Sequence, residues 1–139
     1  MIILDTNILS ELMRIHPEEH VLEWVDTLHR SDTGITAVSV AEILYGIGAL
    51  PGGKKKRRLF EAAKTVFDEY FFDRIFAFDH LAAVEYADIV CQQERLGTPI
   101  SMADAQIAGI CRVNSAGFAT RNIKDFENTG LVLINPWQV

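Results

Sequence analysis

The amino-acid sequence predicts an α/β fold in which a parallel sheet of roughly five strands is flanked by helices. Short runs rich in β-branched and aromatic residues alternate with longer segments whose apolar residues recur at helical spacing. Strands that alternate with helices form βα units, and such units build parallel sheets. With 139 residues, 49% of them hydrophobic, the chain has the size of a single domain spanning residues 1–139.

The elements follow one another without a linker or a repeat. Strands are expected at residues 2–4, 35–38, 74–78, 117–120 and 131–134. A short helix follows the first strand, and Pro17 opens a second one. Further helices begin near Ser39, near Asp79 and at Ser101. Gly97, followed by Pro99, is expected to close the helix that begins near Asp79, and Gly117 is expected to close the last one.

Four acidic residues are predicted to gather at one edge of this sheet. Asp5 directly follows the first expected strand and Asn122 follows the fourth, so both lie where strands have their carboxyl ends. Ligands of open parallel sheets bind at that edge, where the strand order reverses. Two of the predicted helices also begin there and would carry Glu42 and Asp104 toward the same cleft. Asp125 follows shortly after Asn122 and completes the set.

Clustered carboxylates of this kind suit a divalent metal ion. They repel one another, which raises their pKa values unless a cation neutralises them. Mg²⁺ or Mn²⁺ is the expected ion, because hard cations prefer converging carboxylate oxygens. Zinc is not expected, since the cysteines have no C-x-x-C partner and the four histidines are scattered. A metal ion bound there would activate water and stabilise charge on phosphoryl oxygens, so the expected reaction is phosphodiester hydrolysis.

Two of the acids also have a purely structural interpretation. Ser39-x-x-Glu42 is a capping-box pattern and Ser101-x-x-Asp104 is close to one, so each acid could satisfy a backbone N–H at a helix start. Independent caps have no reason to share one edge of one sheet, which favours the metal site. An acidic receiver domain is a further alternative, and Asp79 is its only candidate phosphoacceptor.

The charge of the chain is unevenly distributed. The formal net charge is −6, but residues 54–58 (Lys-Lys-Lys-Arg-Arg) contribute +5, so the remainder carries the difference, −11. A net acidic protein is not a passive electrostatic binder of nucleic acid, yet this run can contact a phosphate backbone. Alternatively it is a solvated helix start, because it directly follows the turn-forming Pro51-Gly52-Gly53.

No membrane segment and no disulfide are predicted. Charged residues interrupt the apolar stretches well short of the roughly 20 residues that a membrane helix needs. Asp5 precedes any signal-peptide core. Cys91 and Cys111 fall on helical patterns and are expected to be small buried hydrophobes in a reducing compartment. We therefore expect a soluble, cytoplasmic protein.

The motifs, taken in order, resemble those of a known family. Four stretches are similar to the motifs of PIN-domain ribonucleases, specifically VapC-type toxins of toxin–antitoxin pairs. The basic stretch at residues 53–56 and the closing Asn135-Pro136-Trp137 look most like the FitB branch of that family. The resemblance spans the chain and implies a PIN-like fold, a homodimer and metal-dependent cleavage of RNA. The four stretches are Ile3-Leu4-Asp5-Thr6-Asn7, Val40-Ala41-Glu42, Ala103-Asp104-Ala105-Gln106-Ile107-Ala108, and Ala119-Thr120-Arg121-Asn122 with Asp125-Phe126.

The resemblance also implies a role for each site residue. Asp5 and Asp104 would be the main ligands of Mg²⁺ or Mn²⁺, and Glu42 would complete the site, directly or through water, and act on the nucleophilic water. FitB-type proteins place an acid where this chain has Asn122. Asp125 is thus left as the fourth carboxylate, and the occupancy of a second metal stays open. The residues assigned to substrate binding are Thr6 and Asn7, which would also orient Asp5, with Arg121, Asn122, Lys54, Lys55 and Lys56.

A protein partner is implied as well. VapB-type antitoxins insert a basic side chain among the acids of the toxin, and the acidity outside residues 54–58 is compatible with that. We expect a small, basic, DNA-binding antitoxin and a higher assembly with it on operator DNA. The alternative function is a non-catalytic α/β binding module whose acids are helix caps and partner contacts. The first helix would supply either part of the antitoxin groove or ordinary core, through Ile8, Leu9, Leu12 and Met13.

Overall fold

A five-stranded parallel sheet forms the centre of the computed structural model, which describes residues 1–139. Every neighbouring pair of strands is parallel. The predicted α/β class is confirmed, although β2 begins two residues earlier than expected and β3 and β5 have only two residues each. The strands are β1 (Ile2–Leu4), β2 (Thr33–Thr36), β3 (Ile75–Phe76), β4 (Gly117–Ala119) and β5 (Leu133–Ile134), in the spatial order β3-β2-β1-β4-β5.

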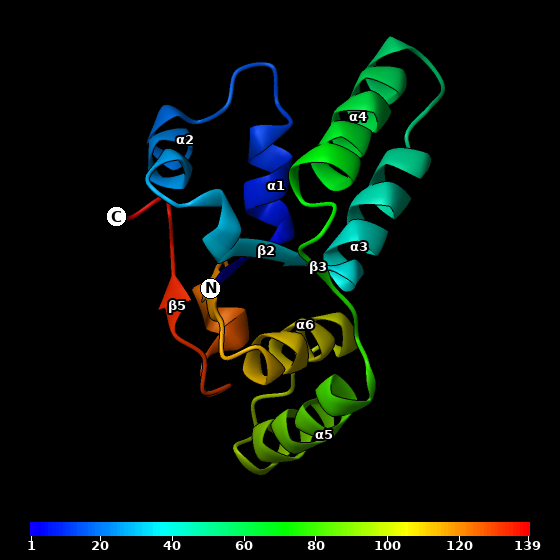
Figure 1. The fold of residues 1–139 in the computed structure, drawn as a ribbon. Coiled ribbons are helices and arrows are strands. Elements are labelled where there is room, and N and C mark those ends of the chain that lie inside the picture. Colours follow the sequence, from blue (N-terminus) through cyan, green and yellow to red (C-terminus); the bar gives the residue numbers. More distant parts are fainter.

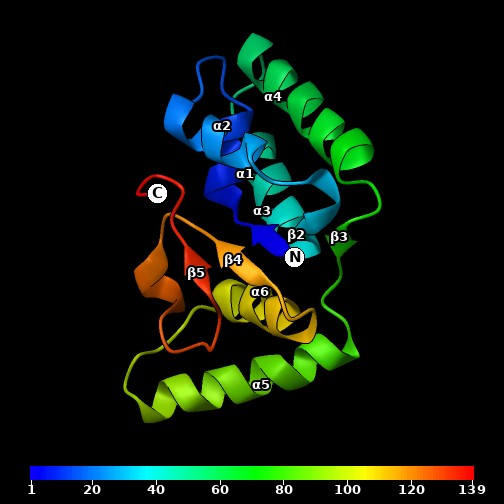
Figure 2. The same ribbon diagram turned by 60° about the vertical axis from the view of Figure 1, so that its left-hand side comes forward.

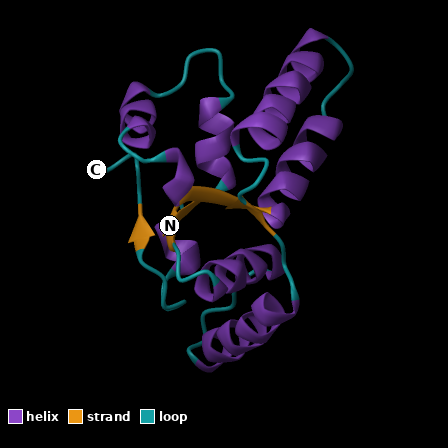
Figure 3. Ribbon diagram, viewed as in Figure 1, coloured by secondary structure: helices purple, strands orange, loops and turns teal.

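Helices cover both faces of the sheet (Figures 1 and 3). One face carries α1 (Thr6–Leu12), α2 (Glu19–Asp26), α3 (Ala37–Gly48) and α4 (Lys54–Thr65), and the other carries α5 (His80–Arg95) and α6 (Met102–Val113), as Figure 2 shows. Short helical turns complete the chain: η1 (Arg30–Asp32), the π-helical η2 (Val66–Tyr70) that continues α4, and η3 (Ile123–Phe126).

Each face of the sheet has its own buried core. Successive strand residues point to opposite faces, so Leu4 packs with α1 to α4 while its neighbour Ile3 packs with α5 and α6. Ala119 and Phe118 divide in the same way on β4. Both central strands are thus buried on both faces, as expected for a parallel sheet between helices. The apolar side of α1 belongs to the first core, through the buried Ile8, Leu9 and Met13.

The ends of α5 follow the sequence signals. The side chain of Asp79 accepts a hydrogen bond from the N–H of Ala82 at 3.0 Å and caps the helix. Asp79 is thereby a helix cap, which argues against its receiver-type role as a phosphoacceptor. At the other end Gly97 adopts φ +71°, and the N–H of Thr98 reaches the carbonyl of Gln93 at 2.9 Å. Left-handed glycine at this position is a common helix stop, so the predicted closure is confirmed.

Other expected boundaries were wrong. Gly117 does not close α6, which ends at Val113; instead it is the first residue of β4, paired with Ile2. The first turn of α3 begins at Ala37, ahead of the expected start near Ser39. Pro17 precedes α2, whose first helical residue is Glu19.

The cysteine prediction holds for one of the two residues. Cys111 is buried in α6, and this burial raises the pKa of its thiol, so it is an inert apolar side chain. Cys91 was expected to be buried too, but it is exposed, because it lies on the outer side of α5. Neither forms a disulfide. None of the helices has the length and apolar content that crossing a membrane requires.

Candidate functional site

Asp5 lies at the carboxyl end of β1 and caps α1. Its Oδ1 accepts a hydrogen bond from the N–H of Thr6 at 2.8 Å. Its Oδ2 accepts one from the hydroxyl of Thr120 at 2.7 Å and another from the side-chain amide of Asn7 at 3.3 Å. Only 5% of Asp5 is exposed. Burial raises the pKa of the Asp5 carboxyl, and the hydrogen bonds from Thr120, Thr6 and Asn7 offset only part of that rise.

Glu42 on α3 and Asp104 on α6 lie near Asp5. Partial burial of its carboxyl group raises the pKa of Glu42, and the charges of Asp5 and Asp104 raise it further. The pKa of Asp104 is also raised, first by burial and then by Asp5 and Asp125, against a hydrogen bond from Ser101 that lowers it. No basic side chain is among these influences. The fold thus brings four acids from distant parts of the sequence within electrostatic range of one another.

Neither Glu42 nor Asp104 serves as the cap that its sequence pattern suggested. The cap of α3 is Thr36, whose hydroxyl oxygen accepts a hydrogen bond from the N–H of Ser39 at 3.0 Å. Glu42 therefore lies beyond the first turn, and its carboxylate accepts no hydrogen bond. The cap of α6 is Ser101, whose hydroxyl oxygen accepts from the N–H of Asp104 at 3.2 Å. The carboxylate of Asp104 stays available for another role.

The chemistry of these side chains fits a hard divalent cation. Asp5, Glu42 and Asp104 offer carboxylate oxygens, which Mg²⁺ and Mn²⁺ prefer. Burial is the main cause of the raised pKa values of Glu42 and Asp104, and repulsion from neighbouring acids, which a cation would relieve, adds to it. No three His, Cys, Asp or Glu side chains are spaced as ligands of a single ion in this structure. Glu42 is exposed and Asp104 is half-buried, so their side chains retain the freedom to move toward a cation.

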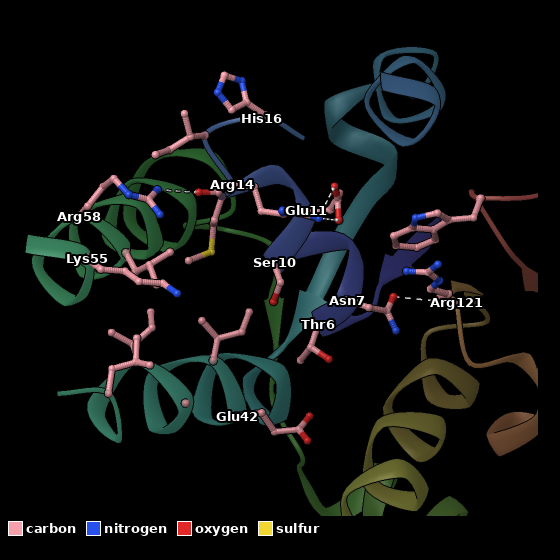
Figure 4. Close-up of a pocket in the computed structure, with 18 residues that line it drawn as sticks. Thr6, Asn7, Ser10, Glu11, Arg14, His16, Glu42, Lys55, Arg58 and Arg121 are labelled. Atoms are coloured by element: carbon pink, nitrogen blue, oxygen red, sulfur yellow. Dashed lines mark hydrogen bonds and ion pairs between the residues drawn. The ribbon is translucent and has the colours of Figure 1, made fainter. Parts of the chain in front are cut away.

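Two cavities flank the acids. The larger, of about 820 Å³, lies between α1, α3 and α4 (Figure 4). Thr6, Asn7 and Glu42 line one end of it, whereas Lys55 and Arg58 line the other. Its apolar wall comes from Met13, Ile15, Ile43, Ile47, Leu50 and Leu59.

The smaller cavity, of about 250 Å³, has an almost wholly polar lining. Asp104 and Asp125 lie on its wall together with Lys124. Asp125 belongs to η3, is exposed, and its carboxylate accepts no hydrogen bond. Glu42 thus borders the larger cavity and Asp104 the smaller one, so the acids lie between the two.

The basic run opens α4, and only part of it is free. Lys56 donates hydrogen bonds from Nζ to the carbonyls of Gly48 and Leu50, at 3.0 and 3.2 Å. Arg58 donates to the carbonyl of Met13 at 3.1 Å. These two side chains hold α3, α4 and the end of α1 together. Lys54 and Lys55 are exposed and form no ion pair, so they remain available to a ligand.

Near Asn122 the chain folds back on Asp5. The N–H of Asn122 donates to the hydroxyl oxygen of Thr120 at 3.0 Å, and the N–H of Arg121 donates to Oδ1 of Asn7 at 3.2 Å. The side chains of Arg121 and Asn122 are both exposed beside the acids. Of the residues assigned to substrate binding, Thr6, Asn7, Arg121 and Asn122 therefore gather at the carboxyl edge, while the lysines lie at the far end of the larger cavity.

Sequence reasoning overlooked Glu11. It is buried, pairs with Arg14 at 3.3 Å, and accepts a hydrogen bond from the N–H of Glu18 at 2.6 Å. These contacts fix the loop between α1 and α2 beside the larger cavity. The only signal in the sequence was the spacing of Glu11 and Arg14, which places opposite charges on one helix face.

The family of the chain follows from comparison with known proteins. A family model described as PIN domain matches residues 2–131. The chain belongs to the PIN-domain family. This PIN domain is also similar along its whole length to individual proteins. The toxin FitB of Neisseria gonorrhoeae is 37% identical over 137 residues, and the VapC ribonuclease Y4jK of Sinorhizobium fredii is 35% identical over 138. Both alignments cover 99% of each chain.

Solved structures agree with this assignment of the PIN domain. The crystal structure of FitAcB from Neisseria gonorrhoeae superposes with a TM-score of 0.93 at 37% identity and covers 100% of both chains. A crystal structure of VapBC2 from Rickettsia felis, bound to a DNA fragment from their promoter, superposes with a TM-score of 0.79 at 26% identity. That alignment covers 97% of this chain and 98% of the other. The predicted PIN-like fold is therefore confirmed.

Proposed function

We propose that the chain is a metal-dependent endoribonuclease of the VapC type, the toxin of a toxin–antitoxin pair. The observation that carries this proposal is a group of acids, Asp5, Glu42 and Asp104, with raised pKa values and no basic partner at the carboxyl edge of a PIN domain. Relatives named as a ribonuclease and a toxin support it. The whole of residues 1–139 acts as one catalytic domain in this proposal.

Each residue has a task that follows from its surroundings. Thr120, Thr6 and Asn7 hold Asp5 in one orientation, so this carboxylate is the fixed point of the metal site. Asp104 is the second ligand, and Asp125 approaches from η3. PIN-domain VapC nucleases generally depend on a divalent metal. When bound, Mg²⁺ or Mn²⁺ lowers the pKa of a water molecule and stabilises charge on the scissile phosphate.

Glu42 is the residue that suits the proton transfer. Its carboxylate is exposed and unbonded, and its raised pKa makes it a better base than an ordinary glutamate. It accepts the proton of the attacking water while Asp5 and Asp104 keep their places. Glu42 contributes to the metal site either directly or through water.

A pair of variants separates catalysis from helix capping. Asp104→Asn should abolish the cutting of a mixed pool of structured RNAs in Mn²⁺ or Mg²⁺ while the cap from Ser101 stays intact. Ser101→Ala should keep metal-dependent cutting but lower the free energy of unfolding by about 1 kcal/mol. Cutting should occur at a few discrete positions and stop in EDTA. Equal cutting by wild type and Asp104→Asn would remove Asp104 from the catalytic site. Absence of metal-dependent cutting by the wild-type chain would instead assign the acids to a non-catalytic binding module.

A small basic antitoxin is the proposed partner. The larger cavity supports this, because its apolar wall lies between α1, α3 and α4 and its end at Glu42 meets the acids. A basic side chain placed there would neutralise the carboxylates and compete with the metal. With such an antitoxin the chain would assemble on operator DNA. We infer a cytoplasmic location for this complex, because operator DNA is found there.

Co-expression with the neighbouring gene of the operon tests this partner. Ile15→Asp puts a charge on the wall of the larger cavity without disturbing the core, because Ile15 is exposed. It should prevent co-purification of the antitoxin and leave kcat for RNA cutting unchanged, because Ile15 is not among the acids. Leu96→Asp, an exposed leucine at the end of α5 outside that cavity, is the matched control. Purification of this chain alone from the native operon would contradict the proposal.

We also propose a homodimer. Tyr45 is 79% exposed on α3, whose neighbouring Leu44 is exposed as well. Large exposed apolar side chains of this kind mark protein interfaces when they adjoin one another. Tyr45→Asp should convert the dimer to a monomer in light scattering, whereas Phe72→Asp, at another exposed aromatic, should not. A monomeric wild-type chain would contradict the proposal.

A further inference from the structure

Arg121 is a cation beside the acids whose charge no carboxylate neutralises. The ion pairs of the chain involve Arg14, Arg74 and Arg112, but not Arg121. Its guanidinium does not lower the pKa of any of the raised acids either. Instead the guanidinium carbon lies 4.9 Å from the centre of the ring of Trp137. Both residues line the larger cavity.

The geometry points to Trp137 as a positioning residue for RNA binding. In this inference the indole holds the guanidinium of Arg121 with its N–H groups free, and those groups bind a phosphate of the RNA next to the bond that is cut. The inference rests on the proposed ribonuclease function. It extends that function to a residue that touches neither the acids nor the scissile phosphate.

Trp137 is itself held firmly. Its side chain packs against the core formed by α1 to α4. Its backbone N–H donates to Oδ1 of Asn135 at 3.0 Å. Asn135 directly follows β5, and β5 is tied to the start of the site because the N–H of Thr120 donates to the carbonyl of Ile134 at 2.9 Å. The backbone at Trp137 is thus anchored to the sheet edge, and the indole, packed against the core, offers a surface to the guanidinium.

The side chain of Asn7 bonds both the backbone of Arg121 and the carboxylate of Asp5. Asn7 accepts the N–H of Arg121 through Oδ1, as the dashed line in Figure 4 shows, and its Nδ2 contacts Asp5. The amide of Asn7 and the hydroxyl of Thr120 together fix the backbone of Arg121 relative to the buried carboxylate. A phosphate held by Arg121 would lie at a defined place relative to the metal site.

Stacking leaves the right atoms free. A cation over an aromatic face is attracted by the ring, while the guanidinium N–H groups point outward in its own plane. Those groups match two phosphate oxygens at once. A polyanion approaching clustered carboxylates also needs a nearby cation to offset repulsion, and the cation of Lys56 is already bonded to two carbonyls. Arg121 is a free cation whose backbone is bonded to Asn7 at the acidic edge, on the side of the larger cavity, whereas Lys124 lies in the smaller one.

Steady-state cleavage and RNA binding test the role of Trp137. The variants are Trp137→Leu, Trp137→Phe, Arg121→Ala and the double Arg121→Ala/Trp137→Leu. Cleavage uses an RNA cut by the wild-type chain, and binding of a labelled single-stranded RNA of mixed sequence is followed at several salt concentrations in the Asp104→Asn background. Tyr70→Leu is the matched control, because it removes a ring that lies 4.1 Å below Arg30. Urea unfolding confirms that each variant is folded.

Trp137→Leu should raise KM about twofold to fivefold with little change in kcat, the loss expected for one cation–π contact. Arg121→Ala should raise KM at least as much and reduce the salt slope of binding by about 0.7, the value for one phosphate contact on a single strand. Trp137→Leu should add nothing in the Arg121→Ala background, and Trp137→Phe should restore most of the binding. Tyr70→Leu should leave KM unchanged.

The failures can be told apart. Additive effects in the double variant, no rescue by phenylalanine, or an equal rise of KM in Tyr70→Leu would overturn the positioning role while the ribonuclease stands. A wild-type chain that neither cuts nor binds RNA would overturn the proposed function, and this inference with it.

Discussion

The hydroxyl of Thr120 donates a hydrogen bond of 2.7 Å to Oδ2 of Asp5, joining the ends of β4 and β1. The same hydroxyl oxygen accepts the N–H of Asn122 at 3.0 Å. Burial raises the pKa of Asp5, and this bond is the largest influence that lowers it. Thr120 therefore favours the ionised form of a buried acid while it holds the next segment of the site in place.

Thr120→Val should move the acidic limb of the pH–rate profile to higher pH. Removing the donor takes away an influence that lowers the pKa of Asp5, so that pKa rises further and less carboxylate is present at a given acidic pH. Affinity for Mn²⁺ should fall most at the acidic end of the pH range, because a protonated acid does not bind metal. Rates measured from pH 5 to 9 in saturating and limiting Mn²⁺ check both effects.

Thr33→Val is the control for that substitution. The hydroxyl of Thr33 also belongs to a buried threonine and donates to the carbonyl of Arg30 at 2.8 Å, at the opposite end of the sheet. Both variants should lose about 1 kcal/mol of stability. An identical shift of the pH profile in both would show that the effect of Thr120 is not specific to Asp5.

Metal removal should destabilise the chain in a pH-dependent way. The pKa of Asp104 is higher in the folded chain than its usual value, so the native state binds more protons than the unfolded state between the two values. Without metal, stability therefore falls as pH rises through that window and then levels off. At pH values above that window, Mn²⁺ should raise the Tm of the wild-type chain, because the ion binds only the folded state. Thermal unfolding in EDTA and in Mn²⁺ from pH 4 to 8 measures both.

Asp104→Asn should raise the metal-free Tm and remove its increase with Mn²⁺. The amide carries no charge, so the metal-free variant should melt a few degrees above the wild type at pH 7, and Mn²⁺ should no longer raise its Tm. Glu94→Gln, at an exposed acid on α5 that borders neither cavity, should behave like the wild type. A Tm of Asp104→Asn that still rises with Mn²⁺ would remove Asp104 from the metal site.

Sequence patterns predicted the architecture because they report backbone preferences and burial. Alternating strand and helix signals identified five parallel strands, and Asp79 with Gly97 marked both ends of α5, since caps depend on one or two local residues. Boundaries failed where a tertiary contact decided them. Gly117 was predicted both as a helix stop and as the first residue of a strand, and its pairing with Ile2 in β4 decides for the strand.

The acids of the candidate site could be predicted from the sequence, but the side-chain contacts around them could not. Asp5, Glu42 and Asp104 stand out in the sequence because their residue type suits metal binding at strand and helix ends. The contact of Trp137 with Arg121 and the bonds of Lys56 to two carbonyls depend on side-chain positions across the fold. No spacing in the sequence reports such contacts, so five adjacent basic residues could not be divided into free and engaged ones.

Lys55 and Lys56 should therefore respond differently to neutralisation. Lys55→Gln should weaken binding of single-stranded RNA and reduce its salt slope by about 0.7, because its exposed ammonium lines the larger cavity. Lys56→Gln should instead lower the midpoint of urea unfolding, because its side chain joins α3 to α4. Anisotropy at several salt concentrations and urea curves distinguish the two. An unchanged salt slope in Lys55→Gln would assign that residue to solubility.

The tight approach of α5 and α6 makes Gly109 sensitive to a single methyl group. A Cβ added there would lie 2.7 Å from the carbonyl oxygen of Ala82 and 3.1 Å from the backbone nitrogen of Tyr86, both on α5. Backbone atoms cannot rotate away, so Gly109→Ala should lower the free energy of unfolding by about 1–3 kcal/mol. Gly48→Ala is the control, because no atom lies within 4 Å of its added Cβ and alanine favours helix by up to about 1 kcal/mol. Equal free energies of unfolding for Gly109→Ala and Gly48→Ala would show that α5 and α6 can move apart without loss of stability. These two helices would then not hold Asp104 rigidly against the sheet.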